Sequence, residues 1–135
     1  MSKIEGGCRC GAVRYEMEAV LSVAVCHCRD CQYASGGGPN YIALTPKDMF
    51  RFTLGEPARY TRPGGSGAPV TRMFCATCGT PLISEVAMPI FAVKLGGLDD
   101  PAPYKPAAQI WTCDAPPWHR VDPAIPAFPE NPPSR

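Results

Sequence analysis

The chain has 135 residues and a formal net charge of +1, from thirteen basic and twelve acidic residues. This length fits one domain, and the near-neutral charge lacks the basic footprint of a nucleic-acid-binding protein. No apolar run is long enough to span a bilayer, and residues 1–7 lack the apolar segment of a secretory signal. We therefore expect a cytoplasmic protein that binds neither nucleic acid nor membrane.

Seventeen prolines and thirteen glycines divide the chain into short pieces, which disfavours long helices. A short helix is expected at 29–34, after a cysteine-rich turn. Segments rich in β-branched and aromatic residues predict strands, which together indicate an all-β domain of small antiparallel sheets. We place these strands at 12–17, 41–44, 50–54, 70–74, 82–84 and 90–94, with a last short strand at 110–112.

The C-terminal segment has a different composition from the rest of the chain. Residues 122–135 contain five prolines and few side chains that could pack. We expect a single domain at 1–121, followed by an extended, poorly ordered tail at 122–135.

Seven of the eight cysteines fall into three clusters: C-R-C at 8–10, C-H-C-R-D-C at 26–31 and C-A-T-C at 75–78. Cysteines spaced C-x-C are too close to form an unstrained disulfide. In a chain without a secretory signal, clustered cysteines are typical of metal ligands or catalysts. The clusters divide into two pairs and one triplet, which predicts two metal sites of different kinds.

The two pairs, Cys8 with Cys10 and Cys75 with Cys78, can close a tetrahedral site of four thiolates. Glycines beside both pairs permit the tight backbone that such a site needs. A closed site of this kind is structural, and it would join the N-terminal segment to a distant hairpin. Four thiolates suit iron as well as zinc.

The triplet Cys26, Cys28 and Cys31 supplies three thiolates within six residues. Three ligands leave one position of a tetrahedral zinc for water or substrate, which is typical of a catalytic site. A fourth protein ligand would instead close the site, and the candidates are His27, His119 and Cys113. Cys113 has two further interpretations, as a small partly buried residue or as a reactive thiol beside the metal.

The ordered motifs G-G-C-R-C-G, C-H-C-R-D-C, F-C-A-T-C-G-T, K-L-G-G-L-D-D and P-P-W run through nearly the whole chain. Together they resemble the glutathione-dependent formaldehyde-activating enzyme family, which also includes the centromere protein V domain. The resemblance implies a β-tent fold with two Zn²⁺ per chain. It also implies a structural zinc on Cys8, Cys10, Cys75 and Cys78, and a catalytic zinc on Cys26, Cys28 and Cys31.

The activity that the resemblance implies is a carbon–sulfur lyase reaction, in which glutathione adds to formaldehyde or the adduct is cleaved. The partners would then be a small-molecule thiol and an aldehyde. Glutathione carries two carboxylates, which call for cationic groups or backbone N–H donors. The cationic candidates are Arg29, Arg59, Arg62 and Lys94.

Two other functions fit the same cysteines. One is a non-catalytic zinc scaffold that binds a protein partner. The other is a thiol-redox protein in which Cys113 and a cluster cysteine cycle between oxidation states.

Overall fold

The computed structural model describes residues 3–132, which form a single, mostly β domain with one short helix, α1 (Arg29–Ser35), among them. Single 3₁₀ turns lie at Lys47–Met49, Leu95–Gly97 and Thr112–Asp114. The strands are β1 (Ile4–Gly7), β2 (Arg14–Met17), β3 (Ser22–Cys26), β4 (Asn40–Pro46), β5 (Phe50–Leu54), β6 (Ala58–Pro63), β7 (Pro69–Phe74), β8 (Pro81–Glu85), β9 (Ile90–Lys94) and β10 (Ala108–Ile110).

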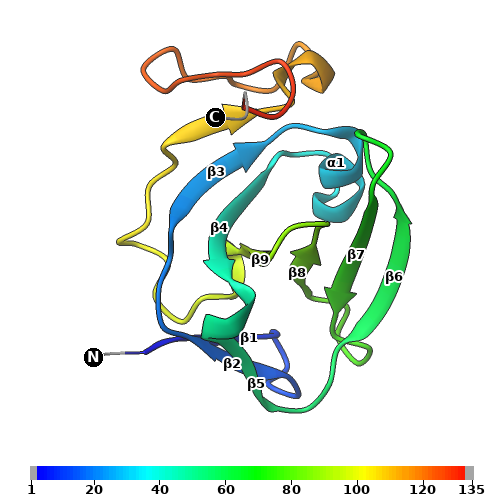
Figure 1. Ribbon diagram of the computed structural model, residues 1–135, viewed down its shortest axis with the longest axis vertical. Helices are drawn as coiled ribbons and strands as arrows, with labels where there is room; N and C mark the ends of the chain where they lie inside the picture. Colours follow the sequence, from blue (N-terminus) through cyan, green and yellow to red (C-terminus); the bar gives the residue numbers. More distant parts are fainter. Residues whose placement is uncertain (1–2, 133–135) are drawn as a thin grey trace.

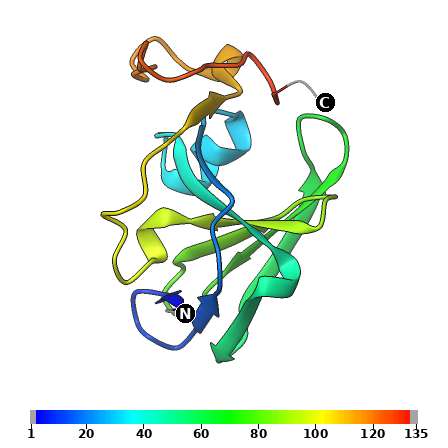
Figure 2. The ribbon, with the colours of Figure 1, turned by 60° about the vertical axis from the view of Figure 1, so that its left-hand side comes forward.

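The strands form two sheets of unequal size. The small sheet has the order β1-β2-β5, and the large one has the order β10-β3-β4-β9-β8-β7-β6. In Figure 1 the small sheet lies at the bottom, and the segment after β10 crosses the top of the molecule. Figure 2 shows the same separation from another side.

The expectation of small antiparallel sheets therefore needs correction, because the large sheet has seven strands and one parallel pair, β10 with β3. Parallel neighbours need a long crossover connection. The chain between β3 and β10, residues 27–107, supplies this length.

Three strands were not predicted: β1, β3 and β6. β1 ends in two glycines, β6 is exposed along nearly its whole length, and β3 ends at the first cysteine of the triplet. The last strand ends earlier than predicted because Trp111 adopts a left-handed conformation with φ 56°, after which a 3₁₀ turn begins. The predictions for β5, β9 and the short helix agree closely with the structure.

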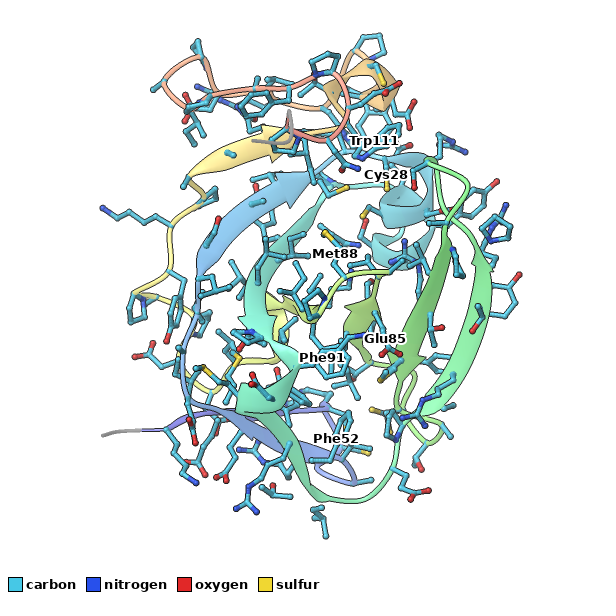
Figure 3. The ribbon with its side chains drawn as sticks, viewed as in Figure 1. Cys28, Phe52, Glu85, Met88, Phe91 and Trp111 are labelled. Carbon is cyan, nitrogen blue, oxygen red and sulfur yellow. The ribbon has the colours of Figure 1, made fainter. Side chains whose placement is uncertain are left out.

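Both faces of the large sheet carry buried residues. Successive side chains along a strand point to opposite faces. One face packs against Tyr15, Met17 and Phe50 of the small sheet, and it carries the row Val23, Ala43, Val93, Ile83 and Met73. Phe52 and Phe91, labelled in Figure 3, pack against this cluster.

The opposite face of the large sheet forms a second, smaller cluster. Ala24, Ile42 and Ala92 pack there against Cys26 and Cys31. The triplet is thus set on a different face of the sheet from the main core.

The C-terminal segment, expected to be an extended tail, contains turns and bends and is hydrogen bonded along β10. The N–H of Gln109 donates to the carbonyl of Pro126 (2.8 Å), and the N–H of Phe128 donates to the carbonyl of Gln109 (2.9 Å). The domain boundary at residue 121 stays a prediction, and residues 1–2 and 133–135 of the predicted domain and tail lie outside the described part. Within residues 3–132, no helix has the length and apolar character needed to cross a membrane.

Candidate metal centres

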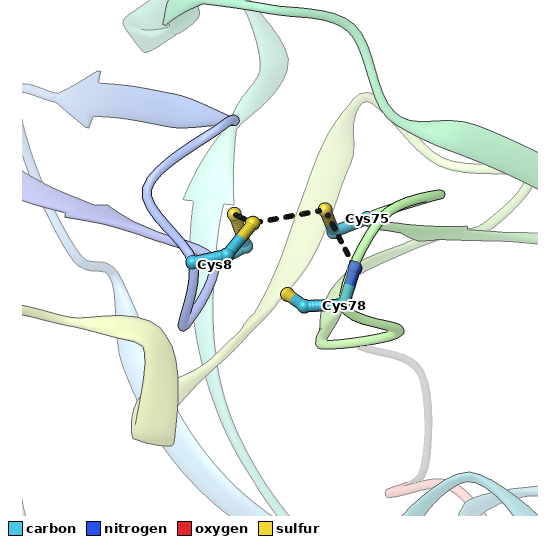
Figure 4. A group of neighbouring side chains, drawn as sticks. Cys8, Cys75 and Cys78 are labelled. Atoms are coloured by element: carbon cyan, nitrogen blue, oxygen red, sulfur yellow. Dashed lines mark hydrogen bonds between the residues drawn. The ribbon is translucent and has the colours of Figure 1, made fainter.

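The first cysteine group joins two turns that are far apart in the sequence. The turn between β1 and β2 supplies Cys8 and Cys10, and the turn between β7 and β8 supplies Cys75 and Cys78. The Sγ atom of Cys10 lies 3.6 Å from that of Cys8 and 3.8 Å from that of Cys75. All four sulfurs lie within 4.8 Å of one another and could hold a metal ion (Figure 4).

Backbone N–H groups point at the sulfurs of this group. Val13 donates to Cys8 Sγ at 3.2 Å, and Thr77 and Cys78 both donate to Cys75 Sγ at 3.4 Å. The Thr80 hydroxyl lies 3.1 Å from Cys78 Sγ, and its hydrogen bond is the largest of several, including those from the backbone of Thr80 and Cys10, that lower the pKa of this thiol to about 5. Hydrogen bonds of this kind stabilise thiolates, which are the form that binds metal.

The second group comes from one short stretch of chain. Cys26 is the last residue of β3, Cys28 is the N-cap of α1, and Cys31 lies in the first turn of that helix. The N–H of Cys31 donates to Cys28 Sγ at 3.3 Å, so the N-cap bond also fixes a ligand. The three sulfurs lie within 4.8 Å of one another and could hold a second metal ion. In Figure 3, Cys28 lies near Trp111, which packs against this cluster.

The three thiols of the triplet do not ionise equally. Hydrogen bonds from Cys26 and Cys28 lower the pKa of Cys31, and the charge on Lys94 acts in the same direction. The pKa of Cys26 is raised by the same hydrogen bonds and by its burial. Burial lowers the pKa of Lys94, and the negative charge on Cys31 opposes that shift. The three thiols therefore influence one another, and Lys94 is the cation that acts on Cys31.

None of the proposed fourth ligands joins the triplet within residues 3–132. The His27 ring is buried, and its Nδ1 lies 2.9 Å from Nδ1 of His119. The Nε2 of His119 lies 2.7 Å from the carbonyl oxygen of Gly37 and donates to it. Since that bond fixes the proton of a neutral His119 on Nε2, its Nδ1 accepts and the Nδ1 of His27 donates. The two rings are thus hydrogen bonded to one another.

Cys113 is exposed, and its Sγ lies 3.7 Å from the carboxylate of Asp114. Desolvation and this carboxylate raise the pKa of Cys113, which opposes formation of a reactive thiolate. The interpretations of Cys113 as a partly buried residue and as a metal ligand therefore both fail against the structure.

A cavity of about 330 Å³ lies between α1 and strands β6 to β9. Of the four cationic candidates from the sequence, only Lys94 lines it. Arg72 lines it as well, and the hydroxyl of Ser84 accepts hydrogen bonds from both cations. The sequence analysis missed Arg72 and Ser84, although the alternation along 70–74 and 82–84 would have placed each on a defined face.

Comparison with known proteins identifies one family. A family model described as "Glutathione-dependent formaldehyde-activating enzyme" matches residues 3–114. A crystal structure of a Rhodobacter sphaeroides protein, determined as a structural genomics target, is similar with a TM-score of 0.60 and 19% sequence identity. The alignment covers 92% of this chain and 98% of that one, which shows a shared fold. No curated protein matches the chain.

Proposed function

Because the chain belongs to the glutathione-dependent formaldehyde-activating enzyme family, we propose that it is a zinc-dependent carbon–sulfur lyase. The proposed reaction adds a thiol, glutathione or a similar molecule, to formaldehyde or another small aldehyde, or cleaves the adduct. By the same kinship we assign the two sheets to the β-tent fold.

The observation that carries this proposal is the contrast between four convergent sulfurs and three. Tetrahedral zinc with Zn–S bonds of about 2.3 Å places its sulfurs about 3.8 Å apart. The distances of 3.6 and 3.8 Å from Cys10 to its neighbours fit this value. Cys8, Cys10, Cys75 and Cys78 would therefore hold a structural zinc, and Cys26, Cys28 and Cys31 a catalytic zinc with one free position.

Zinc at the triplet would supply a Lewis acid to the reaction and favour the thiolate form of the substrate. The thiol gives up its proton, the new S–C bond forms as the C=O π bond breaks, and the former carbonyl oxygen takes up a proton. Cleavage reverses each of these changes. Cys26, Cys28 and Cys31 fix the position of the reacting groups, and the ammonium of Lys94 balances the negative charge of the thiolates beside it.

An exchange experiment tests the proposal. Formaldehyde and glutathione combine without a catalyst, so the rate of exchange between free and bound formaldehyde should be measured by NMR exchange spectroscopy. The zinc-loaded protein should raise this rate, whereas Cys28→Ser should not and Cys113→Ser should match the unmodified protein. Equal rates with the unmodified protein and Cys28→Ser would contradict the proposed function.

A further inference from the structure

One row of side chains crosses the face of the large sheet that carries the triplet. The strand register places Tyr60 opposite Arg72, Arg72 opposite Ser84, and Ser84 opposite Ala92. Lys94 follows two residues after Ala92 and therefore points to the same face. Arg72, Ser84 and Lys94 thus converge beside the cavity, on the face that also holds Cys26.

The two cations share a single neutral partner. Arg72 donates to Ser84 Oγ at 2.8 Å and Lys94 donates to the same atom at 3.1 Å. Ser84 and Lys94 are both buried. Among residues 3–132, no carboxylate forms an ion pair with either cation, although five ion pairs occur elsewhere. Buried or partly buried cations are normally paired. Here the thiolates of the triplet act on Lys94, whereas Arg72 has no ion-pair partner among the described residues.

The triplet balances only part of this charge. Three thiolates around a divalent ion carry a net charge near −1, whereas Arg72 and Lys94 together carry +2. The remainder is a single positive charge, which matches a monovalent carboxylate better than a dianionic phosphate. The guanidinium fork also suits a carboxylate, and the Ser84 hydroxyl, whose oxygen already accepts from both cations, keeps its own hydrogen to donate.

The cavity beside these cations is large enough for a small molecule. Its volume of about 330 Å³ lies at the lower end of the range for ligand sites. Tyr60 and Ala34 line it together with the two cations. Lys94 connects this cavity to the triplet, because it lines the cavity and its charge acts on Cys31.

We propose that Arg72, Ser84 and Lys94 form a carboxylate-binding subsite, and that the thiol which reacts at the triplet carries a carboxylate seated on it. The proposal rests on the proposed function for the identity of the reacting group, but the anion subsite itself does not. It predicts that the preferred substrates are small thiols that carry a carboxylate. Neutral thiols of the same size should be poorer substrates.

Binding of an anion without a thiol tests the subsite directly. Propionate is titrated into the zinc-loaded full chain, and the side-chain Nε–H resonance of Arg72, assigned with Arg72→Lys, is followed by NMR. We expect a saturable shift in the unmodified protein and binding at least about tenfold weaker in Lys94→Met. Arg59→Met is the matched control, because Arg59 lies on the neighbouring strand, next to Tyr60 on the opposite face. No shift, or tighter binding of inorganic phosphate than of propionate, would overturn the assignment.

Turnover provides the second test. The exchange rate with formaldehyde is compared for 3-mercaptopropionate and for 2-mercaptoethanol, which lacks the carboxylate. We expect a preference of about tenfold or more for the acid, lost in Arg72→Met and kept in Arg59→Met. Equal rates for the two thiols in the unmodified protein would overturn the subsite. If neither thiol reacts faster than in buffer, the proposed function fails, and the propionate titration still decides the subsite.

Discussion

The two cysteine groups both offer thiol ligands, but they draw them from the chain in different ways. In the group of Cys8, Cys10, Cys75 and Cys78, the Sγ atoms that approach one another come from residues 65 positions apart. In the triplet, all three sulfurs come from the end of β3 and the start of α1. Ligands from distant segments tie the fold together, whereas ligands from one segment hold a metal without depending on the rest of the fold.

The surroundings of the two groups differ as well. The four-cysteine group lies between two turns, with Cys10 and Cys78 exposed. The triplet is buried or half-buried and shares a sheet face with two cations and a cavity. The number of converging ligands, together with the groups beside them, distinguishes a structural role from a chemical one.

The sharpest way to break this comparison is to remove one ligand of the four-cysteine group. Cys75→Ser should leave most of the chain unfolded at 25 °C, because a structural zinc contributes about 10–16 kcal/mol in small domains whose whole stability is about 5–15 kcal/mol. Thermal unfolding followed by circular dichroism measures this loss. Cys113→Ser, an exposed cysteine outside both groups, is the control, and equal melting temperatures for the two variants would contradict a structural role.

The matching change in the triplet is Cys28→Ser. Serine is a favoured N-cap residue and keeps the cap of α1, so the fold should survive. Activity should fall about a hundredfold or more. Even the loss of a residue that only hydrogen bonds to a metal ligand typically lowers metal affinity or activity by about 10–100-fold. Metal analysis and the exchange assay should show one zinc and little turnover. Unfolding as complete as that of Cys75→Ser would mean that both groups are structural.

A smaller effect on stability is expected for a change where the C-terminal segment meets the chain around the triplet. His119→Ala removes the bonds to the buried His27 ring and to the carbonyl of the half-buried Gly37, and leaves both groups without these partners. The free energy of unfolding should fall by about 2–3 kcal/mol. Hydrogen exchange should become faster at the amide of Phe128, which bonds to β10. His119→Gln keeps a donor for Gly37 and should restore part of the loss, and an unchanged exchange rate in His119→Ala would contradict this view.

The smallest expected effect is on the pH dependence of metal binding by the four-cysteine group. Hydrogen bonds, the largest from the Thr80 hydroxyl, lower the pKa of Cys78 to about 5. This ligand is therefore a thiolate above that pH and takes up a proton as the pH falls through it. Thr80→Val should raise this pKa, so that metal release begins at a higher pH, and should weaken metal affinity at pH 7 by about tenfold. A titration with a chromogenic chelator measures both. Thr77→Val is the control, because Thr77 contributes only its backbone N–H; an equal effect in both variants would contradict the role of the Thr80 hydroxyl.

The sequence predicted the grouping of the cysteines and several strands because the signals are local. Cysteine spacing of two or three residues shows which sulfurs can share an ion, and the apolar pattern of β5 and β9 shows their bounds. The roles of the two groups, structural and catalytic, stay predictions that the experiments above address.

The features that the sequence did not predict depend on contacts between distant residues. His27 and His119 are separated by 92 positions, and the sequence around each does not indicate that the two rings meet. Arg72, Ser84 and Lys94 meet only because three strands align in register. The docking of residues 122–132 on β10 arises in the same way, since an edge strand accepts a proline-rich segment whose composition alone indicates no partner.

X-ray absorption at the zinc edge tests the central claim most directly. One ion with four sulfur ligands and one with three should give an average of about 3.5 sulfurs per zinc. Saturating glutathione should raise this average to about 4, as its sulfur enters the free position. An average of four sulfurs before glutathione is added, unchanged afterwards, would show that both sites are closed and would contradict the account.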